Sequence, residues 1–365
     1  LLEKCGAKKP MLVCDRSSFD FLFLKDYLDS LSWDFVRFDG FSPNPKYDEV
    51  KEGVELFRQE NCDAILSIGG GSAIDTAKNI KMFAVLNPDE VYLKQELQYS
   101  SIPHIAIPTT AGTGSESTHF SVVYYNGEKQ SVAQDCMLPD AVVLEPRLLE
   151  TLPVYQKKST LLDAMCQCIE AIWSVNTSDT CRKYAKAGLK LILANMDDYL
   201  EGKTAANEKI MLGANYGGRA INLSQTTAAH AMSYKITSLF GISHGHAVSL
   251  CIPYVWRYLL DHAEESTCPE LLQEAFSILR EVFRQGDDQL ALQVFQKILK
   301  KFDLACPALE NEQDMELLVK SVNPGRLKNS PVPMDETALQ NLYQEIFHPI
   351  KVSVIVPVYN VEAYL

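Results

Sequence analysis

Two hydrophobic patterns divide the chain near residue 150. Before that point, short apolar runs alternate with segments whose apolar residues recur at helical spacing, a pattern typical of parallel strands connected by helices. The strand candidates are residues 11–15, 35–40, 64–70, 104–110 and 141–146. From Thr151 onward apolar residues recur every three or four positions, and long strand candidates are absent until the last fifteen residues. The sequence therefore predicts an α/β domain over residues 1–150 and an all-helical domain over residues 151–348, with a cleft at their junction.

The strand candidate at 64–70 runs into a glycine-rich turn that opens a predicted helix. Gly70 and Gly71 carry no side chain that would hold a pyrophosphate away from the backbone amides, and Ser72 can cap the helix and donate a hydroxyl bond. Asp75 follows in the first turn of the helix. One such motif is weak evidence, because it is equally compatible with a plain strand-to-helix turn. The standard dinucleotide and P-loop fingerprints are both absent.

A second glycine-rich turn follows the strand candidate at 104–110. It offers flexible backbone and small hydroxyl side chains along which a ribose or nicotinamide can lie: Thr109, Thr110, Thr113 and Ser115. Two different turns of this kind in succession favour a nucleotide site over plain connections. Upstream, Asp39 ends another strand candidate, where an acid can bind both hydroxyls of an adenosine ribose and repel a 2′-phosphate. An isolated aspartate at such a place is more often only a turn former.

Candidate metal ligands lie in the helical half. Asp163 and Gln167 stand four residues apart, which places them on one helical face. His230 and His244 follow in glycine-, serine- or alanine-rich surroundings, and a single helical histidine is usually a structural residue. Together these four residues supply the nitrogen and oxygen donors of a divalent-metal site.

Net charge and cysteine usage narrow the class of partner. The formal net charge of −13 argues against a nucleic-acid or anionic-membrane partner, because either needs a basic surface. Any anionic substrate must be met by a few local cations. No apolar run approaches the roughly 18 residues of a membrane-spanning helix. The ten scattered cysteines form no zinc-ribbon or paired motif, which favours free thiols in a reducing cytoplasm over a disulfide framework.

Four motifs, GGGSAIDTAK, PTTAGTGSE, LLDA and HGHA, occur in an order and spacing that resembles the iron-containing, or group III, alcohol dehydrogenases over residues 1–348. The resemblance implies a dehydroquinate synthase-like architecture, with a Rossmann-like domain that binds NAD(P)H and a helical domain that holds a divalent metal, iron or zinc. It implies that the cofactor is bound by Asp39, Gly70, Gly71, Ser72, Asp75, Thr109, Thr110, Thr113, Ser115 and Lys129. Asp39 favours NAD(H) over NADP(H), and Lys129 reaches the ribose. The implied metal ligands are Asp163, Gln167, His230 and His244.

Two positions depart from the family pattern. Gln167 stands where members usually carry histidine, so the ligand set exchanges an imidazole nitrogen for an amide oxygen and leaves the metal's identity open. Tyr234 replaces a histidine one turn after His230. Proton delivery to the product can run through Tyr234, His246 or water, among which the sequence does not choose.

The surrounding sequence resembles the branch that includes phosphonoacetaldehyde reductases, which form 2-hydroxyethylphosphonate. The expected partner is therefore a small, anionic aldehyde or alcohol. Arg219 and Lys235 are the candidate substrate cations, although each can equally be a solvated or ion-paired residue. A polyol-phosphate dehydrogenase or a cyclising enzyme of the same fold is the alternative. A homodimer is the candidate assembly.

The last residues follow a different pattern. Residues 349–365 include VSVIVPVYN, which resembles the opening of a family 2 glycosyltransferase domain. We interpret this tail as a truncated fusion, in preference to a last strand of the present fold. If Gln167 marks a site that has lost its metal, the chain is a cofactor-binding scaffold for the attached glycosyltransferase.

Overall fold

A five-stranded parallel sheet forms the first half of the protein. The computed structural model describes residues 1–365 except 16–24, 27, 29, 31–32, 310 and 349–365. The sheet has the strand order β2-β1-β3-β4-β7. Its strands are β1 (Pro10–Cys14), β2 (Val36–Phe38), β3 (Ala64–Gly69), β4 (His104–Pro108) and β7 (Ala141–Val142). Each overlaps one strand candidate of the sequence, so the predicted parallel sheet is confirmed.

The central strands place the two glycine-rich turns side by side. Every residue of β1 and β3 is buried, as expected for strands covered on both faces. In the register of β3 with β4, Gly69 lies opposite Pro108. The amide of Thr109 also donates a hydrogen bond of 3.0 Å to the carbonyl of Gly69. The two turns therefore leave the same edge of the sheet next to each other.

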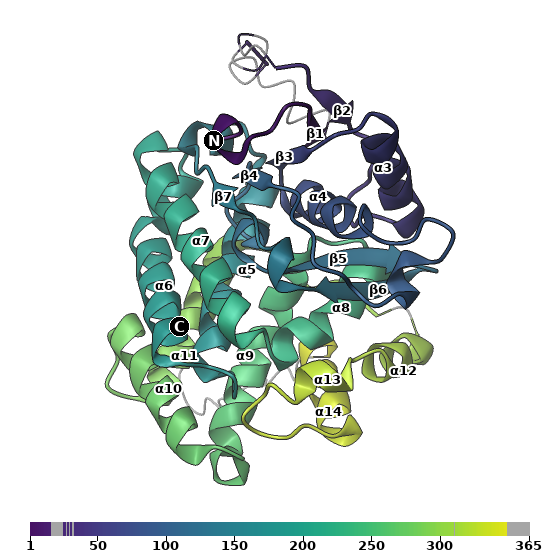
Figure 1. Ribbon diagram of the computed structural model, residues 1–365. Coiled ribbons are helices and arrows are strands. Elements are labelled where there is room, and N and C mark those ends of the chain that lie inside the picture. The colour runs from purple at the N-terminus through teal and green to yellow at the C-terminus, as the bar shows by residue number, and fades with distance from the viewer. Residues whose placement is uncertain (16–24, 27, 29, 31–32, 310, 349–365) are drawn as a thin grey trace, which may run out of the picture.

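Two helices and a hairpin complete this half. Helix α3 (Tyr47–Gln59) packs against α4 (Gly71–Phe83), which follows the first glycine turn. Strands β5 (Phe120–Tyr125) and β6 (Glu128–Ala133) form an antiparallel hairpin outside the main sheet. Figure 1 shows the hairpin between α4 and the helices of the second half, and the contacts of α4 with β5 agree.

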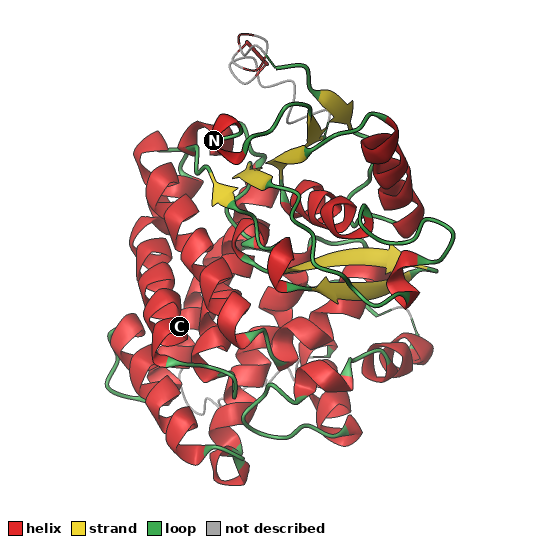
Figure 2. Cartoon of the chain, viewed as in Figure 1, coloured by secondary structure: helices red, strands yellow, loops and turns green. Residues whose placement is uncertain are grey.

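Helices make up the second half, as predicted, and Figure 2 shows them filling the region away from the sheet. Helix α5 (Val154–Trp173) lies at its centre, with residues 161–173 entirely buried. The helices around it are α6 (Asp179–Leu200), α7 (Asn207–Ser224), α8 (Ala228–Phe240), α9 (His244–Asp261), α10 (Pro269–Phe283), α11 (Asp288–Phe302), α12 (Glu312–Lys320), α13 (Pro324–Leu327) and α14 (Glu336–Phe347). Within the described ranges, no helix is both long and apolar enough to cross a membrane.

The halves meet closely where the second glycine turn crosses α7. Gly114 has a φ of 62°, in the left-handed region that glycine adopts most readily. A Cβ at Gly114 would lie 2.4 Å from the Cα of Gly218 on α7, and a Cβ at Gly218 would lie 2.7 Å from the Cα of Gly114. Only glycine at both positions permits this backbone-to-backbone contact.

Candidate active site

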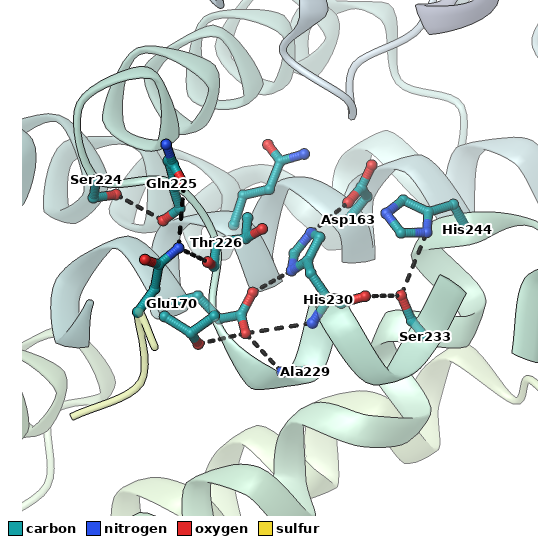
Figure 3. Close-up of polar contacts among 12 residues, drawn as sticks. Asp163, Glu170, Ser224, Gln225, Thr226, Ala229, His230, Ser233 and His244 are labelled. Carbon is teal, nitrogen blue, oxygen red and sulfur yellow. Dashed lines mark hydrogen bonds and ion pairs between the residues drawn. The ribbon is translucent and has the colours of Figure 1, made fainter. Parts of the chain in front are cut away.

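Three predicted metal ligands converge in one place. Asp163 comes from the middle of α5, His230 from the first turn of α8, and His244 is the first residue of α9. Their ligand atoms all lie within 4.8 Å of one another, and His230 Nε2 lies 3.3 Å from Asp163 Oδ1. Figure 3 shows the imidazole of His230 between the carboxylates of Asp163 and Glu170.

Hydrogen bonds orient both imidazoles so that their Nε2 atoms are available to a ligand. The Nδ1 of His230 contacts a carboxylate oxygen of Glu170, which is fully buried on α5 (Figure 3). Glu170 also accepts hydrogen bonds from the hydroxyl of Thr227 at 2.6 Å and the amide of Ala229 at 2.9 Å. The Nδ1 of His244 lies 3.5 Å from the hydroxyl of Ser233. Such carboxylate–histidine pairs fix the tautomer and ring angle of metal-binding histidines.

Burial and neighbouring charges set the ionisation of the ligands. Burial lowers the pKa of His244 to about 3, so its imidazole is neutral at physiological pH. Burial alone would raise the pKa of Asp163, but the hydrogen bond with His230 and the nearby charge of that imidazole hold it below its ordinary value. His230 differs: although burial lowers its pKa, the charge of Glu170 and the hydrogen bonds with Asp163 and Glu170 raise it to about 9. A carboxylate and a neutral imidazole are the forms that bind metal ions, so metal binding at His230 would displace a proton.

Gln167, the fourth predicted ligand, lines the same cavity one turn after Asp163. Its Nε2 donates a 3.1 Å hydrogen bond to the carbonyl of Thr113, while its Oε1 is buried without a hydrogen-bond partner. A buried, unsatisfied amide oxygen costs free energy unless something binds it. The donor set of one carboxylate, two imidazoles and one amide oxygen suits iron or zinc better than a purely oxygen-liganded ion. The residues present therefore fit a divalent transition metal.

A close helix crossing brings His244 to Asp163. Gly245, the next residue, lies against α5, where an added Cβ would be 2.0 Å from the carbonyl oxygen of Ser159 and 2.7 Å from Asp163 Cβ. Any larger residue would push the start of α9 away from α5. The glycine of the HGHA motif therefore determines how closely the ligands on α9 and α5 can approach.

The metal ligands line a cavity of about 730 Å³ together with the glycine turns. Residues from the first half of the chain that line it include Gly71, Ser72, Asp75, Thr110, Thr113, Ser115 and Lys129. Neither Gly70 nor Thr109 lines it, but Gly70 approaches the cavity-lining Thr110, because its added Cβ would lie 3.3 Å from Thr110 Cγ2.

The structure corrects one detail of the first turn. The N-cap of α4 is Gly70, which provides no capping side chain, and Ser72 lies inside the helix. The hydroxyl of Ser72 instead accepts a 3.2 Å hydrogen bond from the amide of Asn44. A helix start without a side-chain cap presents its amides to an anion, as the predicted pyrophosphate site requires.

Asp75 joins the two turns. Its carboxylate accepts hydrogen bonds from the hydroxyl of Ser115 and, at 3.0 Å, from the amide of Val122 on β5. These bonds hold the second turn and the hairpin against α4. Asp39 lies just after β2 with its carboxylate 3.3 Å from Arg37 Nη2, and it does not line the cavity.

Lys129 and Tyr234 connect the hairpin to the metal ligands. The ammonium of Lys129 on β6 lies 3.4 Å from the ring centroid of Tyr234 on α8, a cation–π contact. The ring of Tyr234 stacks on His244 with centroids 5.6 Å apart. Burial, followed by the charge of Arg326, lowers the pKa of Lys129 to about 7.

Besides Asp39, Gly70 and Thr109, two other residues predicted from the sequence do not line the cavity. His246 is buried on the far side of α9, with Nδ1 3.2 Å from the hydroxyl of Tyr155 and Nε2 3.1 Å from the carbonyl of Ala305. Both ring nitrogens are occupied by these bonds, so the structure gives His246 no place in a proton relay. Arg219 lies exposed on α7, where it donates to Asn215 Oδ1 at 3.0 Å. The other predicted cation, Lys235, does line the cavity.

Two further residues were missed by the sequence analysis. Glu170 follows Asp163 by seven residues, the spacing that returns to the same helical face, and this spacing was a usable signal. Arg326 on α13 also lines the cavity, although it lies more than a hundred residues after Asp163 in the sequence. Nothing local in the sequence indicates that position.

Comparisons with known proteins agree with this geometry. The family model of the iron-containing alcohol dehydrogenases matches residues 1–146, and the model of that family's C-terminal part matches residues 157–345. The chain belongs to the iron-containing alcohol dehydrogenase family. This confirms the predicted fold and places the protein among the alcohol dehydrogenases and aldehyde reductases, whose members use a nicotinamide cofactor and a divalent metal. The comparisons do not support the glycosyltransferase-like interpretation of residues 349–365, which lie outside the described part of the structure.

The chain is similar to several named alcohol dehydrogenases and aldehyde reductases. The NAD-dependent methanol dehydrogenase of Bacillus methanolicus is 30% identical over 88% of this chain and 87% of its own length. The phosphonoacetaldehyde reductase of Streptomyces viridochromogenes is 31% identical over 58% of this chain and 57% of its own. The crystal structure of sulfoacetaldehyde reductase from Bifidobacterium kashiwanohense in complex with NAD+ aligns with a TM-score of 0.85 and 25% identity, covering 96% of this chain and 93% of that one.

Proposed function

We propose that this family member reduces a short aldehyde to the primary alcohol, using NADH and a divalent ion held by Asp163, His230 and His244 with Gln167 as the fourth ligand. The observation that carries the proposal is the convergence of three ligand atoms within 4.8 Å, in a cavity that the glycine turns also line. The names of the relatives, which include alcohol dehydrogenases and aldehyde reductases, agree with it.

When bound, a divalent ion would polarise the aldehyde oxygen as a Lewis acid, and the nicotinamide would supply the hydride. The chain contributes position and proton supply. The uncapped start of α4 holds the cofactor's pyrophosphate, and Thr110, Thr113 and Ser115 orient the rest of it. Burial raises the pKa of Tyr234, so its phenol stays protonated at neutral pH and can donate a proton to the alkoxide directly or through water.

We propose NAD(H) rather than NADP(H) as the cofactor. Asp39 follows β2 at the edge of the sheet from which the glycine turns also leave, where a carboxylate repels a 2′-phosphate. The neighbouring Arg37 offsets part of that repulsion. An Asp39→Ala variant should therefore narrow the preference for NADH over NADPH, measured as the ratio of their kcat/KM values.

Phosphonoacetaldehyde, reduced to 2-hydroxyethylphosphonate, is the substrate that we propose. The test is NADH oxidation at 340 nm by metal-stripped protein resupplied with iron(II), zinc, manganese, nickel or magnesium, against this aldehyde and neutral short aldehydes. Metal-dependent turnover that Asp163→Ala abolishes would support the reductase. Turnover of neutral aldehydes alone would retain the reductase and exclude the phosphonate, and NADH binding without turnover under any ion would exclude both.

A further inference from the structure

We propose that Arg326 and Lys235 form an oxoanion-binding subsite beside the metal ligands, so that the substrate is a short aldehyde carrying a terminal phosphonate or sulfonate. This inference rests on the proposed reductase function, which it extends by assigning substrate recognition to two residues. Arg326 was not a candidate from the sequence, and Arg219, which was one, lies outside the cavity.

Ring contacts lead from the metal ligand His244 to Lys129, and Arg326 and Lys235 line the same cavity. The ring of Tyr234 stacks on His244, and the ammonium of Lys129 lies 3.4 Å from the centroid of the Tyr234 ring. Lys235 is the next residue of α8 and lines the same cavity. Arg326 lines it from α13, with its guanidinium carbon 5.9 Å from the ring of Phe120 on β5. The charge of Arg326 is also close enough to lower the pKa of Lys129 after burial has done so.

Neither Arg326 nor Lys235 forms an ion pair with a carboxylate of the described residues, although Asp75 and Asp163 line the same cavity. The polar partner of Arg326 is the neutral amide of Gln225, whose Oε1 lies 3.3 Å from Nη1. Lys320, another cation of the same cavity, differs because its ammonium pairs with Glu316. In a chain with a net charge of −13, two cations without an ion-pair partner in one cavity indicate a site for an anion.

The chemistry of the two groups favours a tetrahedral oxoanion. A guanidinium presents parallel N–H donors that match two oxygens of a phosphonate or sulfonate, and an ammonium adds a charge without directional demand. A molecule with an aldehyde at one end and such a group at the other can contact the metal-binding residues and the cations simultaneously. Neutral short aldehydes would contact only the metal-binding residues.

The test compares the protein with Arg326→Gln, Arg326→Lys and the control Lys328→Gln, which removes an exposed charge two residues away that does not line the cavity. For each, kcat/KM is measured with phosphonoacetaldehyde, sulfoacetaldehyde and propanal, alongside the dissociation constant of NADH. Loss of charge-assisted hydrogen bonds should lower kcat/KM for the two anionic aldehydes by about 10- to 100-fold in Arg326→Gln. The same variant should leave propanal turnover and NADH affinity within about twofold, and Lys328→Gln should resemble the unchanged protein. Arg326→Lys should fall between them, because it keeps the charge and loses the paired donors.

A binding measurement separates this inference from the reductase function. Ethylphosphonate and ethanesulfonate cannot be reduced, so their affinity for the NADH-bound protein is measurable by calorimetry even if no aldehyde is turned over. Weaker binding in Arg326→Gln would support the subsite regardless of turnover. Equal losses for propanal and the anionic aldehydes, a weakened affinity for NADH, or ethylphosphonate binding unchanged by Arg326→Gln would each overturn the subsite while leaving the reductase function standing.

Discussion

Glu170 controls the metal site without lining the cavity. Its buried carboxylate holds the Nδ1 of His230 and accepts two further hydrogen bonds from the start of α8. Although burial opposes its ionisation, the charge of His230 and these bonds keep the pKa of Glu170 below its ordinary value. Glu170 thus orients the imidazole of His230 so that its Nε2 faces the proposed metal site.

We expect Glu170→Gln to weaken metal binding by about 10- to 100-fold, the usual cost of losing such a partner. The substitution preserves size but removes the charge that orients the imidazole. Competition with a chromophoric chelator measures the dissociation constant directly, independently of turnover. An unchanged constant, in protein whose circular dichroism is native, would show that the carboxylate only supports the fold.

Lys129 should make the stability of the metal-free protein depend on pH. Its pKa is lowered to about 7 in the folded protein, so between pH 7 and its unfolded pKa near 10.5 the unfolded state binds more protons. Stability should therefore rise with pH across that interval, and Lys78, with its pKa lowered to about 8, acts in the same direction. Below pH 7 Lys129 is charged in both the folded and the unfolded state, so the full cost of burying that charge lowers the stability of the folded protein.

Replacing Lys129 with methionine should flatten this rise, by at most about 1.4 kcal/mol per pH unit, the limit for one group. Urea unfolding at several pH values between 7 and 9 measures the slope. Lys320→Met is the control, because Lys320 is exposed and its pKa is raised by Glu316. A slope that both variants leave intact would contradict the assignment to Lys129.

The sequence predicted individual ligands better than their surroundings. Asp163, His230 and His244 could be identified because their types and motifs are specific. Arg326 could not, because it reaches the cavity only through the packing of α13 against α8, which no local pattern encodes. Arg219 was misassigned because a run of small residues around it gives no indication of which side of α7 faces the cavity.

The central strands β1, β3 and β4 were predictable because they are short and largely buried, so each appears as a nearly unbroken apolar run, whereas β2 and β7 at the sheet edges are only partly buried. The start of α4 was harder to predict, because both glycine and serine are good N-cap residues: the sequence favoured Ser72, whereas the structure has Gly70. The crossing of α9 with α5 could not be predicted at all, since the need for glycine at position 245 comes from Ser159 and Asp163.

That crossing makes a prediction about two helices. Gly245→Ala introduces a Cβ 2.0 Å from the carbonyl oxygen of Ser159, so α9 must move away from α5. We expect a loss of about 1–3 kcal/mol in unfolding free energy, typical of overpacking, together with weaker metal binding. Denaturant unfolding and metal titration measure the two effects. Gly286→Ala, where an added Cβ meets nothing within 4 Å, is the matched control.

In the whole molecule, the two halves contribute different parts of one cavity. The start of α4 and the second turn come from the sheet half, whereas all four proposed metal ligands come from helices of the second half. The division of the chain into two domains near residue 150 remains a prediction.

We therefore expect NADH binding to survive removal of the metal. The dissociation constant of NADH, followed by its fluorescence, should change by less than about tenfold on chelation, because the pyrophosphate is held by the helix start rather than by the ion. Turnover should disappear in the same sample. Loss of NADH binding in parallel with the metal would show that the ion organises both halves of the cavity.

The contact of Gly114 with Gly218 has a mechanical consequence for this shared cavity. Two backbones that touch with no side chain between them cannot slide past each other without a steric clash. If the halves close over a substrate, the crossing would act as a fulcrum, with the smallest displacement there and larger displacements farther from it. Attempts to widen the cavity by engineering should accordingly leave both glycines in place and alter the hairpin or α13 instead.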